Sequence, residues 1–228
     1  MLRREFAGLL AAAAGLPVLA RTERSAMRRY VQRIRRDLEL VRSEQAGALR
    51  EAGERLAERV AAGGALLIFD RRGPYAAEAS GRAGGLMAIS RASDAASVKN
   101  ADAVIIVSDD SAHEADVSFA QAARETGALT VAVCPVRDTR GALGRECDVA
   151  IDNYVTDADA AIEVRGVDAP MAPTSGTLNT AILWALTAAY IEAMEKRGKP
   201  PTVWMSIKRP GAAEFNAAAR KRSQAVGY

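Results

Sequence analysis

Four consecutive residues near the middle of the chain, Ser108-Asp109-Asp110-Ser111, combine two hydroxyls with two carboxylates. Hydroxyls donate hydrogen bonds to phosphate or sugar oxygens without adding a fixed charge. We therefore predict that Ser108 and Ser111 bind a phosphate or a sugar. The alternative for Ser111 is a helix cap, because Glu114 follows three residues later and completes a capping box. Asp109 and Asp110 disfavour a doubly charged anion close by, since like charges repel.

Two further loops carry residues suited to the same ligand. Residues 70–75 join a predicted strand to a predicted helix and contain Gly73, and backbone N–H groups at such a helix start attract anions. Arg72 adds positive charge there, although a plain connecting turn is the alternative interpretation. Thr174 and Ser175 open a later helix, where either is a suitable N-cap. The candidate ligand-binding residues are Ser108, Ser111, Gly73, Arg72, Thr174 and Ser175.

Catalytic residues are harder to single out. Moving a proton between adjacent carbons needs a base, often a carboxylate with a pKa near neutrality. The sequence offers Glu78, Asp109, Asp110 and Glu114 without distinguishing them. His113 is the only histidine and is a second kind of acid–base candidate, with a surface position as its alternative. Glu114 and His113 are therefore the weak catalytic candidates, and no P-loop or Gly-x-Gly-x-x-Gly pattern is present.

The elements that position these residues are predicted from hydrophobic pattern. Val104–Val107 is a continuous β-branched run, which is typical of a parallel strand buried on both faces. Residues 112–126 have helical spacing, and Leu129–Val133 predicts a second buried strand. These three segments form one right-handed β-α-β unit. Ligands of such sheets bind at the carboxyl ends of the strands, where Ser108 lies.

The remaining segments complete an α/β pattern. Further strands are predicted at Ala65–Phe69, Leu86–Ile89 and Val149–Ile151, with an edge strand at Ala161–Val164. Helices are predicted at 76–83, 174–197 and 210–222, and one long helix over Arg21–Ala62, with Gly47 and Gly53 as candidate break points. The sequence therefore predicts a three-layer α/β/α sandwich with a mainly parallel five-stranded sheet, preceded by a long N-terminal helix.

Composition excludes several functional classes. The 228 residues suffice for one domain with a substantial core, and the net charge of +3 is mild. No basic patch interleaved with aromatic residues is present, so no nucleic-acid partner is expected. One histidine and two cysteines leave no room for a His/Cys metal site, and no cofactor is expected. Cys134 and Cys147 are predicted as buried thiols, with a disulfide as the alternative in an oxidising compartment.

The N-terminus resembles a targeting segment. Arg3-Arg4-Glu5-Phe6 precedes the uncharged apolar run Ala7–Leu19, which has the length of a signal-peptide core and is too short to span a bilayer. Paired arginines followed by X-Phe resemble the twin-arginine export signal. We therefore predict a signal peptide at 1–20, a helical segment at 21–62 and an α/β domain at 63–228. The predicted location is periplasmic or exported, without stable membrane insertion after signal removal, and a cytoplasmic protein with an N-terminal extension is the alternative.

Several motifs, in their order along the chain, resemble the sugar isomerase (SIS) domain, in particular an uncharacterised bacterial subfamily of phosphosugar-binding proteins. Ala103–Ser111 resembles the family's strand and serine-rich phosphate loop, and Gly127–Ala132 its following strand. Similar matches are Cys147–Asn153, Pro173-Thr174-Ser175 and Pro201–Asn216. The resemblance implies a SIS-like parallel sheet, a homodimer, and sites shared between subunits at the strand tips.

The same resemblance implies a function. The loop Ser108–Ser111 lacks the glycine of the family's Ser-x-Ser-Gly pattern, and Trp184 and Ala189 stand where an asparagine and a carboxylate are expected. We therefore expect binding of a phosphosugar or other carbohydrate derivative, with isomerase activity weakened or lost. An active aldose–ketose sugar-phosphate isomerase is one alternative, and a structural homodimer without a small ligand is another. Ser108→Ala and Ser111→Ala are both predicted to reduce sugar-phosphate affinity.

Overall fold

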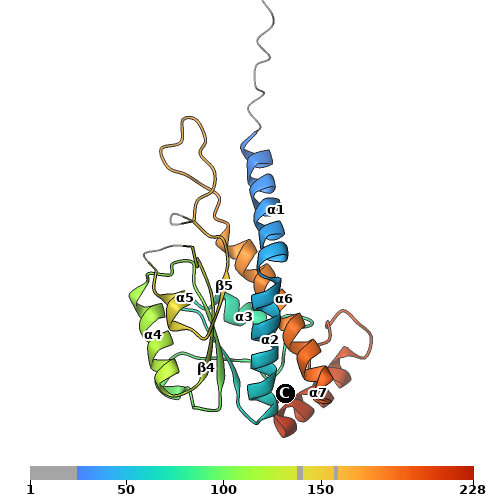
Figure 1. Ribbon diagram of the computed structural model, residues 1–228. Helices are drawn as coiled ribbons and strands as arrows, with labels where there is room; N and C mark the ends of the chain where they lie inside the picture. The colour runs from blue at the N-terminus through green and yellow to red at the C-terminus, as the bar shows by residue number, and fades with distance from the viewer. Residues whose placement is uncertain (1–24, 138–140, 157–158) are drawn as a thin grey trace, which may run out of the picture.

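A parallel β-sheet forms the middle layer of the computed structural model, which describes residues 25–137, 141–156 and 159–228 (Figure 1). The five strands run in the order β2-β1-β3-β4-β5, and each pair of neighbours is parallel. Their bounds are β1 Leu66–Phe69, β2 Ser90–Arg91, β3 Ala103–Val107, β4 Leu129–Cys134 and β5 Val149–Asp152. The expected sheet is therefore confirmed, whereas the predicted signal peptide at 1–20 lies outside the described residues.

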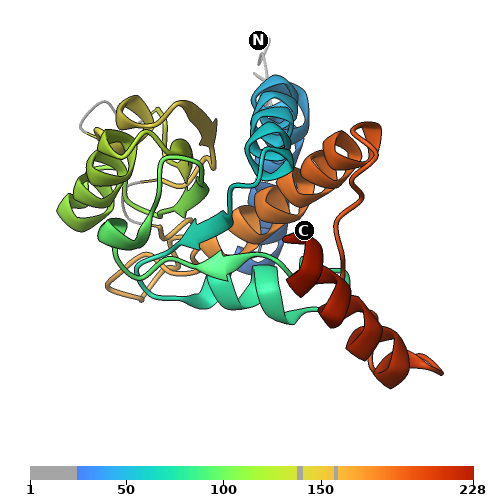
Figure 2. The same cartoon turned by 90° about the horizontal axis from the view of Figure 1, so that it is seen from below.

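Helices cover both faces of this sheet. Figure 2, viewed from below, separates α4 on one side from α2 and α6 on the other, so that the molecule has three layers as expected. The bounds are α1 Ala26–Glu44, α2 Ala46–Ala61, α3 Pro74–Gly81, the 3₁₀ turn η1 Ala95–Ser97, α4 Glu114–Glu125, α5 Leu143–Glu146, α6 Ser175–Lys196 and α7 Ala212–Val226.

Alternation along the buried strands creates one core on each side of the sheet. On β3, Ile105 and Val107 join the core beneath α2 and α6, whereas Val104 and Ile106 join the core beneath α4. Successive side chains of a strand point to opposite faces, so a strand covered on both faces must be apolar at every position. All of β3 is buried, which explains why its sequence lacks any polar residue.

The long N-terminal helix is broken between α1 and α2 at Gln45 (φ −99°, ψ −2°), two residues before the candidate break point Gly47. The Gln45 side chain is bound on both sides, because Nε2 donates to the Tyr154 hydroxyl (2.9 Å) and Oε1 accepts from the Asp152 backbone N–H (3.0 Å). Gly53, the other candidate, lies inside α2, where the helix passes close to Ala189 of α6. Tertiary contacts at Gln45 therefore accompany the break, and glycine does not cause it.

Three local expectations are corrected. The second predicted strand, Leu86–Ile89, is displaced to Ser90–Arg91, and Leu86 instead makes an isolated antiparallel bridge with Val203. The edge strand predicted at 161–164 is reduced to a single bridge between Ile162 and Met171. The predicted capping box does not form, because α4 begins at Glu114 with His113 as its N-cap residue.

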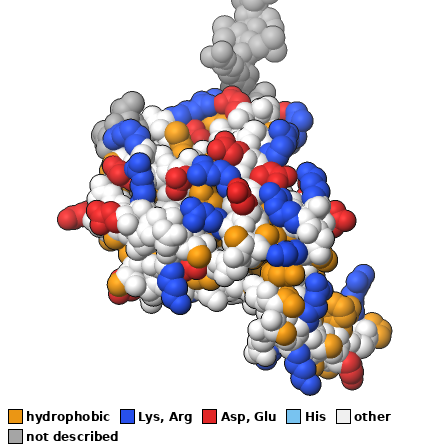
Figure 3. All heavy atoms as spheres, turned by 60° about the horizontal axis from the view of Figure 1, so that its bottom comes forward, with side chains coloured by type: hydrophobic (Ala, Val, Ile, Leu, Met, Phe, Trp, Pro, Cys, Tyr) orange, Lys and Arg blue, Asp and Glu red, His pale blue; other side chains and the backbone are white. Residues whose placement is uncertain are grey.

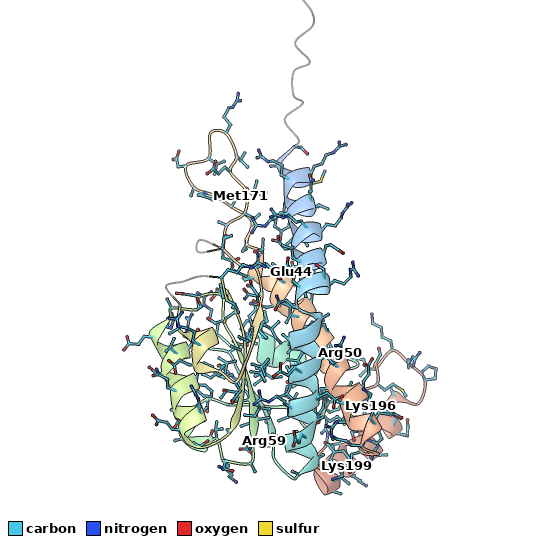
Figure 4. The ribbon with its side chains drawn as sticks, in the orientation of Figure 1. Glu44, Arg50, Arg59, Met171, Lys196 and Lys199 are labelled. Carbon is cyan, nitrogen blue, oxygen red and sulfur yellow. The ribbon has the colours of Figure 1, made fainter. Side chains whose placement is uncertain are left out.

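The amino ends of the strands are braced by a long side chain from α2, and a lysine just after α6 holds the end of α2. Arg59 donates to the carbonyl oxygens of Asn100 (2.8 Å) and Gly127 (3.2 Å), which precede β3 and β4. Lys199 Nζ donates to the carbonyl oxygen of Ala61 at the end of α2 (2.6 Å). Figure 4 shows Arg59 and Lys199 at this end of the molecule, with Glu44 further up, where α1 ends.

The C-terminal part forms a projecting lobe. In Figures 1 and 2, α7 extends away from the sheet, and Figure 3 shows hydrophobic and basic side chains together on this lobe. Ile207 and Phe215 are exposed there (89% and 44%). The side chain of Asn216 fixes the start of α7, since it both donates to and accepts from the Met205 backbone. No helix in the described part of the chain is long and apolar enough to cross a membrane.

Candidate functional site

A cavity of about 340 Å³ lies at the carboxyl ends of β1 and β3. Its walls come from the loop after β1, the loop after β3, and the start of α6, and they include Arg71, Arg72, Tyr75, Ser108, Asp109 and Ser175. The chain passes from β1 outwards to β2 and then returns to β3 on the other side of β1. The cavity therefore lies at the topological switch point, which is the usual ligand position in open parallel sheets.

The loop after β1 is organised by Asp70, which is only 2% exposed. Its carboxylate accepts hydrogen bonds from the backbone N–H groups of Gly73, Tyr75 (2.6 Å) and Ala76 (2.9 Å) at the start of α3. Gly73 has φ +91°, a left-handed conformation that glycine adopts without strain. The anion-binding start of α3 is thus already occupied by a carboxylate of the protein itself.

The hydroxyl of Ser108 is engaged in a similar way. Its Oγ donates to Asp116 Oδ2 (2.6 Å) and accepts from the Asp110 backbone N–H (3.1 Å). Asp116 lies in the first turn of α4, is 1% exposed, and forms an ion pair with Arg71 Nε (3.3 Å). A buried carboxylate needs such partners, because an unpaired charge inside a protein is very costly. Ser108 therefore reaches the cavity as one part of a Ser–Asp–Arg network.

A third carboxylate, that of Asp159, occupies the start of α6. Its Oδ1 accepts from the backbone N–H groups of Thr174 and Ser175 (both 2.9 Å), and its Oδ2 accepts from Ser175 Oγ. Asp159 reaches this position from a left-handed backbone conformation (φ +43°), which aspartate tolerates better than most residues. The negative charge is favourable there, because a helix N-terminus carries partial positive charge.

Tyr75 projects from α3 into the cavity beside these groups. Burial raises the pKa of its phenol, the side chains of Asn179 and Ser175 oppose that rise, and the carboxylates of Asp109 and Asp159 add to it. Asn179 is fully buried one turn beyond Ser175, and its Oδ1 accepts from Asn153 (2.8 Å). Its Nδ2 makes no hydrogen bond of normal geometry among the described residues. The Tyr75 hydroxyl is therefore a neutral polar group at neutral pH.

Asp109 differs from the other carboxylates of the cavity. Its side chain is 27% exposed, and its partners are distant, with Arg71 at 3.9 Å and Arg72 at 3.7 Å. Arg71 is shared with Asp116, and the Arg72 side chain is 70% exposed. Such long, solvent-screened ion pairs contribute little to stability. Among the described carboxylates of the cavity, Asp109 is thus the one that remains available to a ligand.

The structure brings together some of the predicted binding residues. Ser108, Arg72 and Ser175 line the cavity, and Gly73 lies between the lining residues Arg72 and Pro74. Thr174 is buried behind the wall, with its N–H bound to Asp159.

Ser111 was expected beside the other predicted binding residues, but the structure places it apart from them. It does not line the cavity, and its Oγ is buried without a hydrogen-bond partner among the described residues. It lies so close to Gly141 that a Cβ at that position would lie only 1.7 Å from Ser111 Oγ.

The predicted catalytic residues mostly lie elsewhere. His113 and Glu114 begin α4 outside the cavity wall, and Asp110 instead caps the backbone of Ala112. Glu78 binds Arg82 and Trp184 and does not line the cavity. Asp109 is the one carboxylate candidate that reaches the cavity.

Sequence reasoning missed Asp116, Asp159 and Tyr75. The available signal for Asp116 was an aspartate eight residues after Ser108, near the start of the predicted helix. No group of three or more His, Cys, Asp or Glu side chains within residues 25–137, 141–156 and 159–228 is arranged to hold a metal ion.

The architecture has close counterparts among solved structures. A phosphoheptose isomerase from Francisella tularensis superimposes with a TM-score of 0.52 at 10% identity, covering 75% of this chain and 96% of the other. A protein described as a putative phosphosugar isomerase involved in capsule formation, from Bacteroides fragilis, gives a TM-score of 0.50 at 17% identity, covering 74% and 92%. The chain therefore has a SIS-like α/β fold.

Sequence comparison identifies the family. The profile of DUF2529, a domain of unknown function, matches residues 38–158, and the chain belongs to this family. A UPF0309 protein of Geobacillus kaustophilus is 28% identical over 225 residues, which covers 82% of this chain and 90% of that protein. The matched segment includes the loops after β1 and β3, so most of the cavity wall lies within the family domain.

Proposed function

We propose that this protein binds a carbohydrate derivative related to a sugar phosphate in the cavity at the carboxyl ends of β1 and β3. The observation that carries the proposal is the meeting of hydroxyls, carboxylates and guanidiniums from three separate loops around one cavity of about 340 Å³. Sugars are recognised by many convergent hydrogen-bonding groups in a concave site. Two solved proteins of the same fold are described as a phosphoheptose isomerase and a putative phosphosugar isomerase, which supports this ligand class.

Binding without turnover is the form of this function that we propose. Aldose–ketose isomerisation needs a free base beside the sugar carbons. Asp70, Asp116 and Asp159 are each committed to hydrogen bonds within the protein. An active isomerase is the second candidate, and the observation in its favour is that the Asp109 carboxylate is weakly paired.

Ligand titration with thermal unfolding as the readout tests the proposal. Glucosamine 6-phosphate, fructose 6-phosphate and unphosphorylated sugars are the probes, and a ligand at 100 times its Kd stabilises the folded state by about 2.7 kcal/mol. Stabilisation without conversion of the sugar supports a binding protein, and conversion supports the isomerase. If no sugar stabilises the protein, a structural role without a small ligand is the better explanation.

Ser108→Ala is the sharpest variant for this test. Loss of the hydroxyl removes the donor to Asp116 and one polar group from the cavity wall, so we expect sugar affinity to fall about fivefold. Ser111→Ala is the matched control, because the Ser111 hydroxyl is buried away from the cavity. Calorimetric titration of both variants measures the difference. Equal affinity in Ser108→Ala and the wild type would remove Ser108 from the site.

We also propose that the protein forms a homodimer. Exposed apolar side chains support this proposal, with Met27 and Val31 on α1 and Ile207 and Phe215 in the C-terminal lobe. Sedimentation velocity measures the oligomeric state directly, and a monomer at micromolar concentration contradicts the proposal.

Export by a twin-arginine route is proposed from the sequence alone. Replacing Arg3-Arg4 by Lys-Lys is expected to block it, which fractionation of cells would measure. Unchanged export of the Lys-Lys variant would exclude the route.

A further inference from the structure

The polar positions of the cavity that suit a phosphate are already filled by carboxylates of the protein. The backbone N–H groups at the starts of α3 and α6 are bound to Asp70 and Asp159. The Ser108 hydroxyl donates to Asp116. A phosphate entering the cavity would have to displace one of these carboxylates, and each is held by two or more hydrogen bonds or an ion pair.

The net charge of the cavity wall also disfavours a phosphate. The wall carries the four carboxylates of Asp70, Asp109, Asp116 and Asp159 against the two guanidiniums of Arg71 and Arg72. The Arg72 side chain is mostly in solvent, so its charge is screened. Arg71 is divided between Asp116 and Asp109. Arg91 donates to the Asp70 carbonyl oxygen (3.4 Å) and adds a third guanidinium beside the wall. The carboxylates still outnumber the guanidiniums by one, so a cation entering the cavity is attracted while a dianion is repelled.

Asp109 supplies the point of contact for such a cation. Its ion pairs at 3.7 and 3.9 Å are longer than hydrogen bonds, so its oxygens can accept from a ligand without breaking a strong contact. Neutral donors and acceptors stand nearby, because Tyr75 lines the same cavity and the fully buried Asn179 lies against its hydroxyl. The Asn179 side chain opposes the rise in the pKa of the Tyr75 phenol, so this hydroxyl has a polar neighbour behind the cavity wall.

We propose that the carbohydrate bound in this cavity is an amino sugar, whose ammonium group contacts Asp109 while its hydroxyls bind the groups around Tyr75 and Ser175. The inference rests on the proposed function and specifies its ligand class. The amine, and not a phosphate, supplies the main charged contact.

Paired ligands test this inference. Glucosamine, galactosamine and mannosamine are compared by calorimetry with glucose, galactose and mannose, in buffer acidic enough to keep the amines protonated. Glucose 6-phosphate and glucosamine 6-phosphate complete the set. A charge-assisted hydrogen bond predicts that the amine strengthens binding about tenfold in at least one pair. The 6-phosphate is expected to leave affinity unchanged or to weaken it.

Variants of Asp109 assign the effect to this residue. Asp109→Asn removes the charge at nearly constant shape and is expected to abolish the advantage of the amine, whereas Asp109→Glu keeps it. Asp168→Asn is the matched control, because Asp168 is an exposed aspartate outside this cavity. Circular dichroism of each variant establishes that it is folded before the titration.

The outcomes separate this inference from the proposed function. If sugars bind but the amine gives no advantage, or if Asp109→Asn retains the advantage, the inference is overturned while sugar binding stands. Tighter binding of the 6-phosphates than of the amino sugars also overturns it and leaves the proposed function supported. Failure of every sugar to bind the folded wild type overturns both.

Discussion

At both ends of the parallel sheet, aspartate carboxylates accept hydrogen bonds from backbone N–H groups, but the two sets of carboxylates have different surroundings. At the amino ends of the strands, Asp102 accepts from the backbone N–H groups of Ala65 and Lys99 (both 2.9 Å), and Asp148 accepts from the N–H and hydroxyl of Thr130. At the carboxyl ends, Asp70 and Asp159 bind helix starts in the same manner.

The difference lies in what each set encloses. The amino-end carboxylates join adjacent segments directly, and Arg59 donates to the carbonyl oxygens of Asn100 and Gly127 there. The carboxyl-end carboxylates instead surround a cavity and leave Asp109 weakly paired. Buried carboxylates alone thus do not mark a functional site. A functional site is indicated where such carboxylates surround an accessible cavity and one of them is only weakly paired.

The largest effect is expected for Asp102→Ala at the closed end. Asp102 is 6% exposed, and its loss leaves the backbone N–H groups of two part-buried hydrogen bonds without their acceptor. We expect the free energy of unfolding to fall by about 2–4 kcal/mol, measured by urea denaturation. Glu192→Ala, at an exposed position on α6, is the control. A loss no larger than that of the control would contradict the bracing role.

A smaller effect per pH unit is expected at alkaline pH, through the thiol that precedes β5. Burial raises the pKa of Cys147 from 9.0 to about 12, and the Thr130 side chain opposes that rise. The folded state therefore keeps the proton more tightly than the unfolded state. Its contribution to stability is complete below about pH 9 and is lost as the pH rises towards 12.

Urea denaturation at stepped pH measures this loss. The free energy of unfolding should fall by at most about 1.4 kcal/mol per pH unit for this thiol. Burial also raises the pKa of Cys134, so some alkaline dependence remains in Cys147→Ala. A slope in Cys147→Ala equal to that of the wild type would show that Cys147 does not contribute.

The smallest effect on stability is expected for Asp159→Asn at the open end. An asparagine still caps α6, so the free energy of unfolding should fall by only about 1 kcal/mol. Removing the charge also removes the repulsion between Asp159 and an external anion near the helix start, so inorganic phosphate should stabilise this variant more than it stabilises the wild type. Thermal unfolding with and without phosphate measures both effects. Equal responses to phosphate would mean that Asp159 does not block an anion site.

Much of the fold was predictable because it depends on local pattern. The continuous apolar run Val104–Val107 identified a strand buried on both faces, and the structure places it in the middle of the sheet. The break at Gln45 was not predictable, because it coincides with hydrogen bonds to Asp152 and Tyr154, more than a hundred residues away. Sequence patterns report local preference and do not contain such distant contacts.

The site was predicted only in outline, for the same reason. The loops after β1 and β3 follow recognisable strands, so Arg72 and Ser108 were placed correctly at the cavity. The sequence did not predict the carboxylates that form hydrogen bonds and ion pairs with these loops. Asp116 is only 1% exposed, and its partners Ser108 and Arg71 lie in other loops of the chain. The pairing of Asp159 with Ser175 depends on the path of the loop between them.

Gly53 makes the dimensions of the cavity depend on a contact far from it. A methyl group at this position would lie 2.8 Å from the backbone carbon of Ala189, so α2 and α6 can be this close only where a side chain is missing. α6 supplies Ser175 to the cavity wall, whereas Gln45, just before α2, holds the end of β5. A larger residue at position 53 would therefore push α6 away from α2 and would move Ser175 on the cavity wall with it, although no ligand touches Gly53.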